Sequence, residues 1–176
     1  MKITRSEKYQ RKRAERAALE KAEKKRVEKY MKMAIRQARL AGKKGEVPVG
    51  AVIVKDGAVI SRAHNLRESK RIATAHAEIL AIEKACRKVG DWRLTNAEMF
   101  VTLEPCSMCA GAVANARIKS LYFGAYERKG GACGSVHNVL ENTGLNSNVN
   151  VTGGVLEEEC SSAITAFFEN KRNKIT

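Results

Sequence analysis

Four side chains at two places in the sequence have the types and spacing of a metal site. His76 lies two residues before Glu78, and Cys106 lies three residues before Cys109. Each of the two motifs is at the start of a predicted helix. Cysteines three apart at a helix start project to one side, where the helix N-terminus stabilises thiolates. One imidazole and two thiolates make three ligands, which fits a catalytic zinc with its fourth position open to water. Glu78 is then placed to take a proton from that water without filling the open position.

The Cys-x-x-Cys pair by itself has two other interpretations. It can be a redox pair, or half of a structural zinc site that needs a fourth ligand. Cys86, Cys133 and His137 are the candidates for that ligand, but none of them forms a second closely spaced pair. A histidine two residues before a glutamate is unspecific alone, so the information lies in the combination of the two motifs. Cys86 and Cys160 are most simply buried small hydrophobic residues, and the sequence assigns no role to Cys133.

Alternating strands and helices must position these side chains. An Asp-Gly pair at 56–57 between two β-prone runs predicts a hairpin. Apolar periodicity and helix-end signals predict the remaining elements. The predicted strands cover residues 49–54, 58–63, 99–103, 120–124 and 149–152, and the predicted helices cover 31–42, 76–89, 106–116 and 156–174. Strands that alternate with helices after an opening hairpin predict the α/β class, as a three-layer α/β/α sandwich with a mixed sheet of about five strands.

The composition is that of a soluble protein. The chain has 176 residues, of which 44% are hydrophobic and 30% charged, and this length suits one domain with a core of its own. The longest apolar stretch, residues 47–54, is far shorter than a membrane-spanning helix, so we expect no membrane partner. The first 30 residues lack the apolar centre of a signal peptide. The count of five cysteines is odd, which favours a reducing compartment and a cytoplasmic location.

A large positive charge is the first indication of a partner. Lysines and arginines total 33 against 19 acidic residues, a formal net charge of +14. Residues 1–30 hold 12 basic and 5 acidic side chains, and residues 31–176 hold the other 21 and 14, so each part carries +7. Such an excess favours a polyanionic partner, nucleic acid before anionic membrane. A basic protein without any polyanionic partner is the alternative on charge alone.

The charge pattern also divides the chain. Residues 1–29 contain neither Gly nor Pro, are rich in Ala, Lys, Glu and Arg, and have too few apolar residues for a core-facing stripe. We interpret them as a basic helical N-terminal extension, and residues 30–176 as the folded domain. The extension is either an electrostatic arm for RNA or an addition without function. Its glutamates argue against an organelle-targeting peptide.

The two metal motifs resemble a known family when they are taken together. A His-x-Glu motif followed by Pro-Cys-x-x-Cys is the signature of zinc-dependent nucleobase deaminases. The longer match is to bacterial tRNA-specific adenosine deaminases of the TadA type, in the cytidine/deoxycytidylate deaminase superfamily. The similar runs are residues 45–54, 64–65, 74–79, 92–94, 101–112, 116–118, 124–125, 129–132, 134–135 and 167–168. The resemblance thus covers about residues 30–172, and within it the catalytic interpretation of the metal motifs is favoured over the redox and structural ones.

The resemblance implies a fold, an activity and a cofactor. It implies the cytidine deaminase-like fold, a homodimer, and one zinc ion per subunit bound by His76, Cys106 and Cys109. The implied reaction is the hydrolytic deamination of the wobble adenosine of a tRNA anticodon to inosine. A zinc-activated water would be the nucleophile, with Glu78 as the proton shuttle.

The resemblance also implies how the anticodon loop is bound. The residues it assigns to substrate and RNA binding are Asn65 at the flipped nucleotide, and Glu127, Lys129, Phe168 and Arg172 on the anticodon-loop surface. Simple packing of the final helix is the alternative for Phe168, and a solvated loop position is the alternative for Lys129.

Three positions depart from the family pattern. Ile72-Ala73 stands where the family usually has Asp-Pro, Glu127 where an Asp is expected, and Asn146-Ser147 where Asn-His is usual. None of these changes removes a metal ligand or the proton shuttle. They bear on RNA contacts and not on the reaction.

Two other functions remain open. A free-base or nucleoside deaminase of the guanine or cytidine type would share the zinc motifs and the mechanism. The basic charge, the loop at residues 129–135 and the Phe-Phe helix followed by Arg172 favour tRNA. An RNA-binding protein with a structural zinc and no turnover is the second alternative, and Glu78 argues against it because a structural site needs no base beside the metal.

Overall fold

The computed structural model describes residues 5–141 and 148–173. They form a five-stranded sheet in the order β2-β1-β3-β4-β5. The strands are β1 (Gly50–Lys55), β2 (Ala58–His64), β3 (Ala97–Leu103), β4 (Ser120–Ala125) and β5 (Asn150–Thr152). β1 pairs antiparallel with β2 and β3, whereas β3, β4 and β5 are parallel. The predicted mixed sheet is therefore confirmed. The departure Asn146-Ser147 lies outside the described residues.

The hairpin between β1 and β2 forms at the predicted Asp-Gly turn. Asp56 and Gly57 both have positive φ angles, of 51° and 75°. Two consecutive left-handed residues are what a type I′ hairpin turn requires, and Asp and Gly tolerate that conformation better than most residues.

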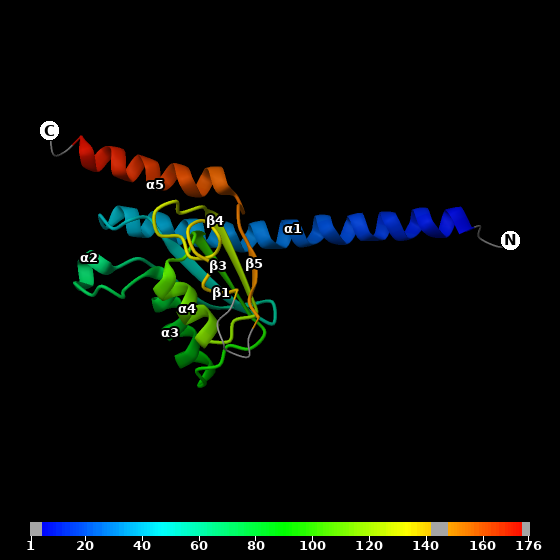
Figure 1. The fold of residues 1–176 in the computed structure, drawn as a ribbon, viewed down its shortest axis with the longest axis horizontal. Coiled ribbons are helices and arrows are strands. Elements are labelled where there is room, and N and C mark those ends of the chain that lie inside the picture. The colour runs from blue at the N-terminus through cyan, green and yellow to red at the C-terminus, as the bar shows by residue number, and fades with distance from the viewer. Residues whose placement is uncertain (1–4, 142–147, 174–176) are drawn as a thin grey trace.

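Helices cover both faces of the sheet (Figure 1). They are α1 (Arg5–Lys43), α2 (Arg67–Lys70), α3 (Ala77–Val89), α4 (Ser107–Asn115) and α5 (Glu157–Arg172). Ala51 and Ile53 of β1 are buried in the same core cluster as α3 and α4, whereas Val52 and Val54 are buried with residues of α1 and α5. Because side chains alternate between the faces of a strand, one strand serves two cores. The predicted three-layer α/β/α sandwich is confirmed.

The first helix is much longer than its apolar pattern predicts. α1 is a single helix of 39 residues, although the apolar periodicity covers only 31–42. Burial against the sheet begins at Val27, and residues 8–25 are exposed. Figure 1 shows these N-terminal turns extending away from the sheet. At 1.5 Å per residue, the 22 residues from Arg5 to Arg26 span about 33 Å.

The other helix ends lie within one or two residues of their predicted positions. His76 and Cys106 are the N-cap residues of α3 and α4, so each helix begins one residue after its predicted start. α5 ends at Arg172, and Lys174, where the prediction ended, lies outside the described residues. The short helix α2 was not predicted. In the described part of the chain, no helix combines the length and the hydrophobicity needed to cross a bilayer.

Candidate metal centre and substrate pocket

Two helix N-termini bring the three predicted metal ligands together. His76 precedes α3 as its N-cap, Cys106 does the same for α4, and Cys109 lies in the first turn of α4. The Nδ1 atom of His76 is 3.8 Å from Sγ of Cys106 and 3.6 Å from Sγ of Cys109. The three ligand atoms all lie within 4.8 Å of one another. In the described part of the chain, no further His, Cys, Asp or Glu joins this cluster.

These separations fit a tetrahedral zinc ion. Bonds of about 2.3 Å to sulfur and about 2.0 Å to nitrogen, at tetrahedral angles, place N and S ligands about 3.5 Å apart. The two observed N–S separations, 3.6 and 3.8 Å, are close to that value. The donor set therefore fits one ion with three protein ligands.

The electrostatics of the cluster favour thiolate at Cys106. Hydrogen bonds from Cys109 and His76 lower the pKa of the Cys106 thiol to about 3. The pKa of Cys109 is raised, because its thiol donates to Cys106 and is buried. The pKa of His76 is raised mainly by its hydrogen bond with Cys106. The protein thus holds one thiolate and one proton-sharing thiol side by side, and a divalent cation between them would favour the deprotonated form of both.

Glu78 is buried beside this cluster. Its side chain lies in the first turn of α3 and is 4% exposed. Burial raises the pKa of the carboxyl group, because the charged form loses hydration. A buried carboxyl group that holds its proton more strongly than a solvated one can both accept and return a proton, which is what a proton carrier requires.

A cavity of about 520 Å³ opens above the cluster and brings most of the predicted site residues together. Of these residues, the ones that line it are Asn65, His76, Glu78, Cys106, Glu127, Lys129 and Phe168. Cys109 is fully buried beneath the cavity and is not part of its lining. Arg172 does not line it either, although Lys171, its neighbour in α5, does. Phe168 is 46% exposed, which favours a contact surface over simple helix packing for this ring.

The Asn65 side chain is oriented by the buried carboxylate of Glu46. Its Nδ2 donates to Oε2 of Glu46 at 3.4 Å, and its backbone N–H donates to the carbonyl of Val49. Glu46 also accepts the backbone N–H groups of Glu68 and Ser69 at the start of α2. One donor of the Asn65 amide is thereby used, which leaves its carbonyl oxygen for the pocket.

Several residues of the pocket were missed by the sequence analysis. They are Val47, Val49, Arg67, Glu68, Leu103, Glu104, Gly130 and Lys171. The apolar members become a pocket wall only through the tertiary fold. Glu104, however, had a signal: it is a charged residue directly after a buried apolar strand, and it is itself only 2% exposed. The departure Ile72-Ala73 lies in an exposed turn that does not line the cavity.

The candidates for a fourth structural ligand lie elsewhere. Cys86 donates through its thiol to the carbonyl of Trp92. Burial raises the pKa of Cys133 to about 12, so it remains a neutral thiol. In the part of the chain that the structure describes, neither these residues nor His137 belongs to the metal cluster. Because the described residues offer only three protein ligands here, the cluster favours a catalytic over a structural ion.

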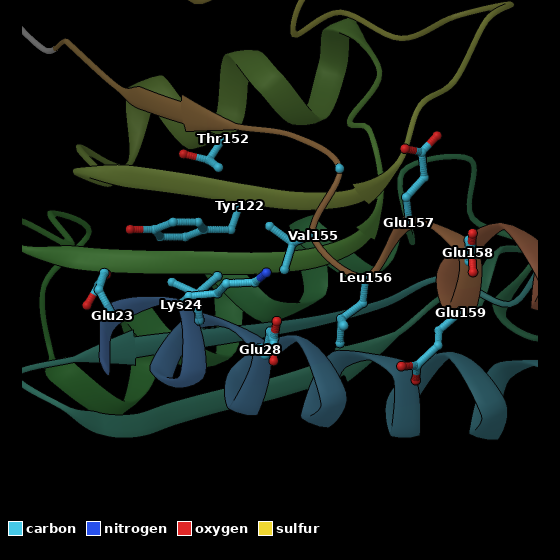
Figure 2. Close-up of a pocket in the computed structure, with 12 residues that line it drawn as sticks. Glu23, Lys24, Glu28, Tyr122, Thr152, Val155, Leu156, Glu157, Glu158 and Glu159 are labelled. Atoms are coloured by element: carbon cyan, nitrogen blue, oxygen red, sulfur yellow. The ribbon is translucent and has the colours of Figure 1, made fainter. Parts of the chain in front are cut away.

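A larger cavity, of about 800 Å³, lies between α1, β4 and the start of α5. Figure 2 shows its lining, in which Lys24 is accompanied by acidic side chains of both helices. The glutamates are Glu23, Glu28, Glu157, Glu158 and Glu159. Neither a histidine nor a cysteine lines it, and its carboxylates would repel a polyanion. Although this cavity is larger, we therefore do not assign the chemistry to it.

Comparisons with known proteins agree with this geometry. Residues 25–169 match the family model described as MafB19-like deaminase. A Bacillus subtilis protein named tRNA-specific adenosine deaminase is 51% identical over 147 residues, which are 84% of this chain and 91% of that protein. A solved structure from a study of A-to-I editing by tRNA:A34 deaminases at the wobble position of transfer RNA has a TM-score of 0.74 and 43% identity, and the match covers 76% of this chain and 97% of that one. A guanine deaminase from Nitrosomonas europaea shares the fold, with a TM-score of 0.70 at 24% identity over 80% of this chain and 83% of its own.

Proposed function

The chain belongs to the MafB19-like deaminases and to the tRNA-specific adenosine deaminases, and on that premise we propose that it converts the wobble adenosine of a tRNA anticodon to inosine. The observation that carries the proposal is the His76–Cys106–Cys109 cluster at the floor of a cavity that also contains the Glu78 carboxyl group.

His76, Cys106 and Cys109 are the residues that would hold one zinc ion per subunit. The spacing of their ligand atoms and the low pKa of Cys106 support this assignment. A zinc ion bound there would supply Lewis-acid activation of a water molecule, since it lowers the pKa of bound water toward neutrality.

Glu78 moves the protons of the reaction. In hydrolytic deamination the water oxygen bonds to C6 while one of its protons goes to N1 of adenine. The second proton then passes from the new C6 hydroxyl group to the amine, the C6–N bond breaks, and ammonia leaves as the C6 carbonyl forms. The buried Glu78 carboxyl group, with its raised pKa, can accept the first proton and donate it again. Its place in the first turn of α3, two residues after a ligand, keeps it close to the reacting atoms.

Asn65, Glu127, Lys129, Phe168 and Arg172 are proposed to bind the anticodon loop. The adenine must leave the base stack to reach a buried ion, and an anticodon loop presents its bases already splayed. The exposed ring of Phe168 offers a stacking surface at the mouth of the cavity, and the exposed ammonium group of Lys129 suits a backbone phosphate. For Arg172 the support is its position in α5, one residue after the cavity-lining Lys171.

A homodimer and a cytoplasmic location are also proposed. The dimer rests on the family resemblance, and light scattering coupled to gel filtration should give twice the chain mass of 19.4 kDa. A monomer at working concentration would contradict it. The cytoplasmic location is supported by the five cysteines, all of which are free of disulfide bonds in the structure, as a reducing compartment favours.

A substrate panel tests the proposed function. We expect a tRNA transcript with adenosine at the wobble position to be converted, and sequencing of its cDNA to show A-to-G change at that position alone. Free guanine and cytidine, measured by ammonia release, are the controls. Ammonia from either of them with the tRNA untouched would retain the site but replace the substrate. Zinc binding without any reaction would favour an RNA-binding protein instead.

A further inference from the structure

Glu104 occupies an unusual place between the metal site and the pocket wall. It follows β3, lies two residues before Cys106, and is 2% exposed. Its backbone N–H donates to the carbonyl of Ala125 at 2.8 Å, which fixes it at the end of the sheet. A buried carboxylate is costly unless several hydrogen bonds stabilise it, so its partners indicate what it does.

Among the described residues, the hydrogen-bond partners of the Glu104 carboxylate lie in one loop, residues 127–135. Oε1 accepts the backbone N–H groups of Cys133 and Ser135, each at 3.0 Å. Oε2 accepts the backbone N–H of Glu127 at 3.1 Å and also the hydroxyl group of Ser135. The Glu104 side chain therefore fixes both ends of this loop, and each of its carboxylate oxygens accepts hydrogen bonds from it.

The loop is packed so closely on Glu104 that one position accepts only glycine. A Cβ added at Gly131 would lie 2.5 Å from Oε2 of Glu104 and 2.4 Å from the carbonyl oxygen of Glu127. Two backbone contacts join the same regions: Ala132 donates to the carbonyl of Pro105, and Gly131 forms a β-bridge with Cys106. The loop and the ligand-bearing segment thus form one unit.

Glu127, Lys129 and Gly130 are the residues of the loop that line the cavity. Oε1 of Glu127 accepts the backbone N–H of Lys129 at 2.9 Å, and the N–H of Gly131 donates to the Glu127 carbonyl. The turn that carries Lys129 therefore starts at the N–H that Glu104 binds. The chain of contacts runs from Glu104 through Glu127 to the exposed Lys129 side chain.

We propose that Glu104 is a positioning residue, which acts through the 127–135 loop to place Lys129 for RNA binding. It is not required for metal binding by His76, Cys106 and Cys109. The inference rests on the proposed function, because it assumes that Lys129 binds the substrate. It predicts that losing the Glu104 carboxylate weakens RNA binding only as long as Lys129 is there to be positioned.

A double-mutant cycle tests this coupling. Binding of an anticodon stem-loop RNA is measured by fluorescence anisotropy in zinc-loaded protein carrying Glu78→Gln, which prevents turnover. We expect Glu104→Gln to raise Kd about tenfold, as the loss of a charge-assisted hydrogen bond would. In a Lys129→Ala background the same change should raise Kd less than about twofold. Zinc content, measured by atomic emission, should stay at one per chain in every variant.

The matched control is Glu46→Gln. Glu46 is also a buried carboxylate that accepts backbone N–H groups, but its partners are Asn65 and the backbone of α2, which belong to a different part of the cavity lining. Its effect on Kd should be the same with and without Lys129. Equal effects of Glu104→Gln in both backgrounds, or loss of zinc on that change, would overturn the proposal.

Two further measurements keep the test decisive. If Glu104→Gln does not fold, Ser135→Ala removes only the hydroxyl bond to Glu104, and the same cycle should give a coupled shift of about threefold. Deamination of wobble adenosine by the unmodified chain is measured in parallel. Its absence would refute the proposed function alone, whereas activity together with an uncoupled cycle would refute only the role of Glu104.

Discussion

At the scale of single residues, the site divides its work between groups that hold an ion and one that carries protons. The three ligands lie at helix N-termini, where backbone N–H groups and the helix dipole stabilise negative charge. Glu78 lies in the same turn as a ligand but is not within the ligand cluster. Binding and proton transfer can therefore be separated by substitution.

Replacing Glu78 with Gln should abolish turnover without releasing zinc. The amide keeps the size of the side chain but cannot accept or donate the transferred proton, so we expect kcat on tRNA to fall about 10³-fold. Zinc per chain, measured by atomic emission, should be unchanged. The control is Cys106→Ser, which should lose both the metal and the activity. Near-native turnover of the Gln variant would show that another group carries the proton.

At the scale of elements, the fold depends on the close approach of α1 to the sheet. A Cβ added at Gly50 of β1 would lie 2.1 Å from the carbonyl oxygen of Ala34 and 2.4 Å from the nitrogen of Ala38. The helix backbone thus rests directly on the strand. Arg26 holds the same helix farther along, with two hydrogen bonds to Glu98 of β3, at 2.7 and 2.9 Å.

Gly50→Ala should therefore destabilise the protein. The helix would have to move away from the strand, and overpacking of this kind costs about 1–3 kcal/mol. Urea unfolding followed by circular dichroism measures the loss. The matched control is Gly42→Ala on α1 itself, where the added Cβ would meet only Pro48 at 3.7 Å. A Gly50 variant as stable as the control would contradict the packing described for α1.

Sequence patterns predicted the elements that carry their own local signals. The β1–β2 turn is specified by Asp56 and Gly57, and the end of α3 by Gly90, whose φ of 76° is the usual helix C-cap conformation. The composition of residues 1–29 predicted a helical extension, but not that it continues without a break into the helix at 31–42, because its exposed turns lack an apolar stripe. The helix α2 has only four residues and no buried side chain, so it leaves no periodic pattern.

The candidate site shows the same division. His76, Cys106 and Cys109 could be predicted because their types and spacing reflect the chemistry of one ion. Val47 and Leu103 could not, because a pocket wall is made by strands that meet only in the folded chain. Glu104 lies between these cases: its position after an apolar run marked it, but its partners lie 23 to 31 residues away in sequence.

At the scale of the whole molecule, positive charge is spread over the extension and the domain, whereas the larger of the two cavities described above is acidic. The exposed turns of α1 contain the ion pairs Arg11–Glu15 and Arg16–Glu20, which stabilise a solvated helix by a few tenths of a kcal/mol each. The helix can therefore present the lysines of its exposed turns away from the sheet (Figure 1).

Removal of residues 1–25 should weaken RNA binding without unfolding the domain. Burial in α1 begins only at Val27, so the thermal midpoint should change little. Fewer cations would meet the RNA phosphates, so the plot of log Kd against log salt should become shallower. The control is the full-length chain with Lys8, Lys12 and Lys21 changed to Gln, which should shift in the same direction. An unchanged slope would show that the extension does not contact RNA.

The most direct test of the account as a whole is wobble inosine formation measured against zinc content. The protein is depleted with a chelator and titrated with zinc, and A-to-G change at the wobble position of one tRNA transcript is quantified at each step. We expect the rate to rise in proportion to bound zinc and to stop rising at one ion per chain. A depleted protein that deaminates the wobble adenosine at the full rate would contradict the assignment of His76, Cys106 and Cys109.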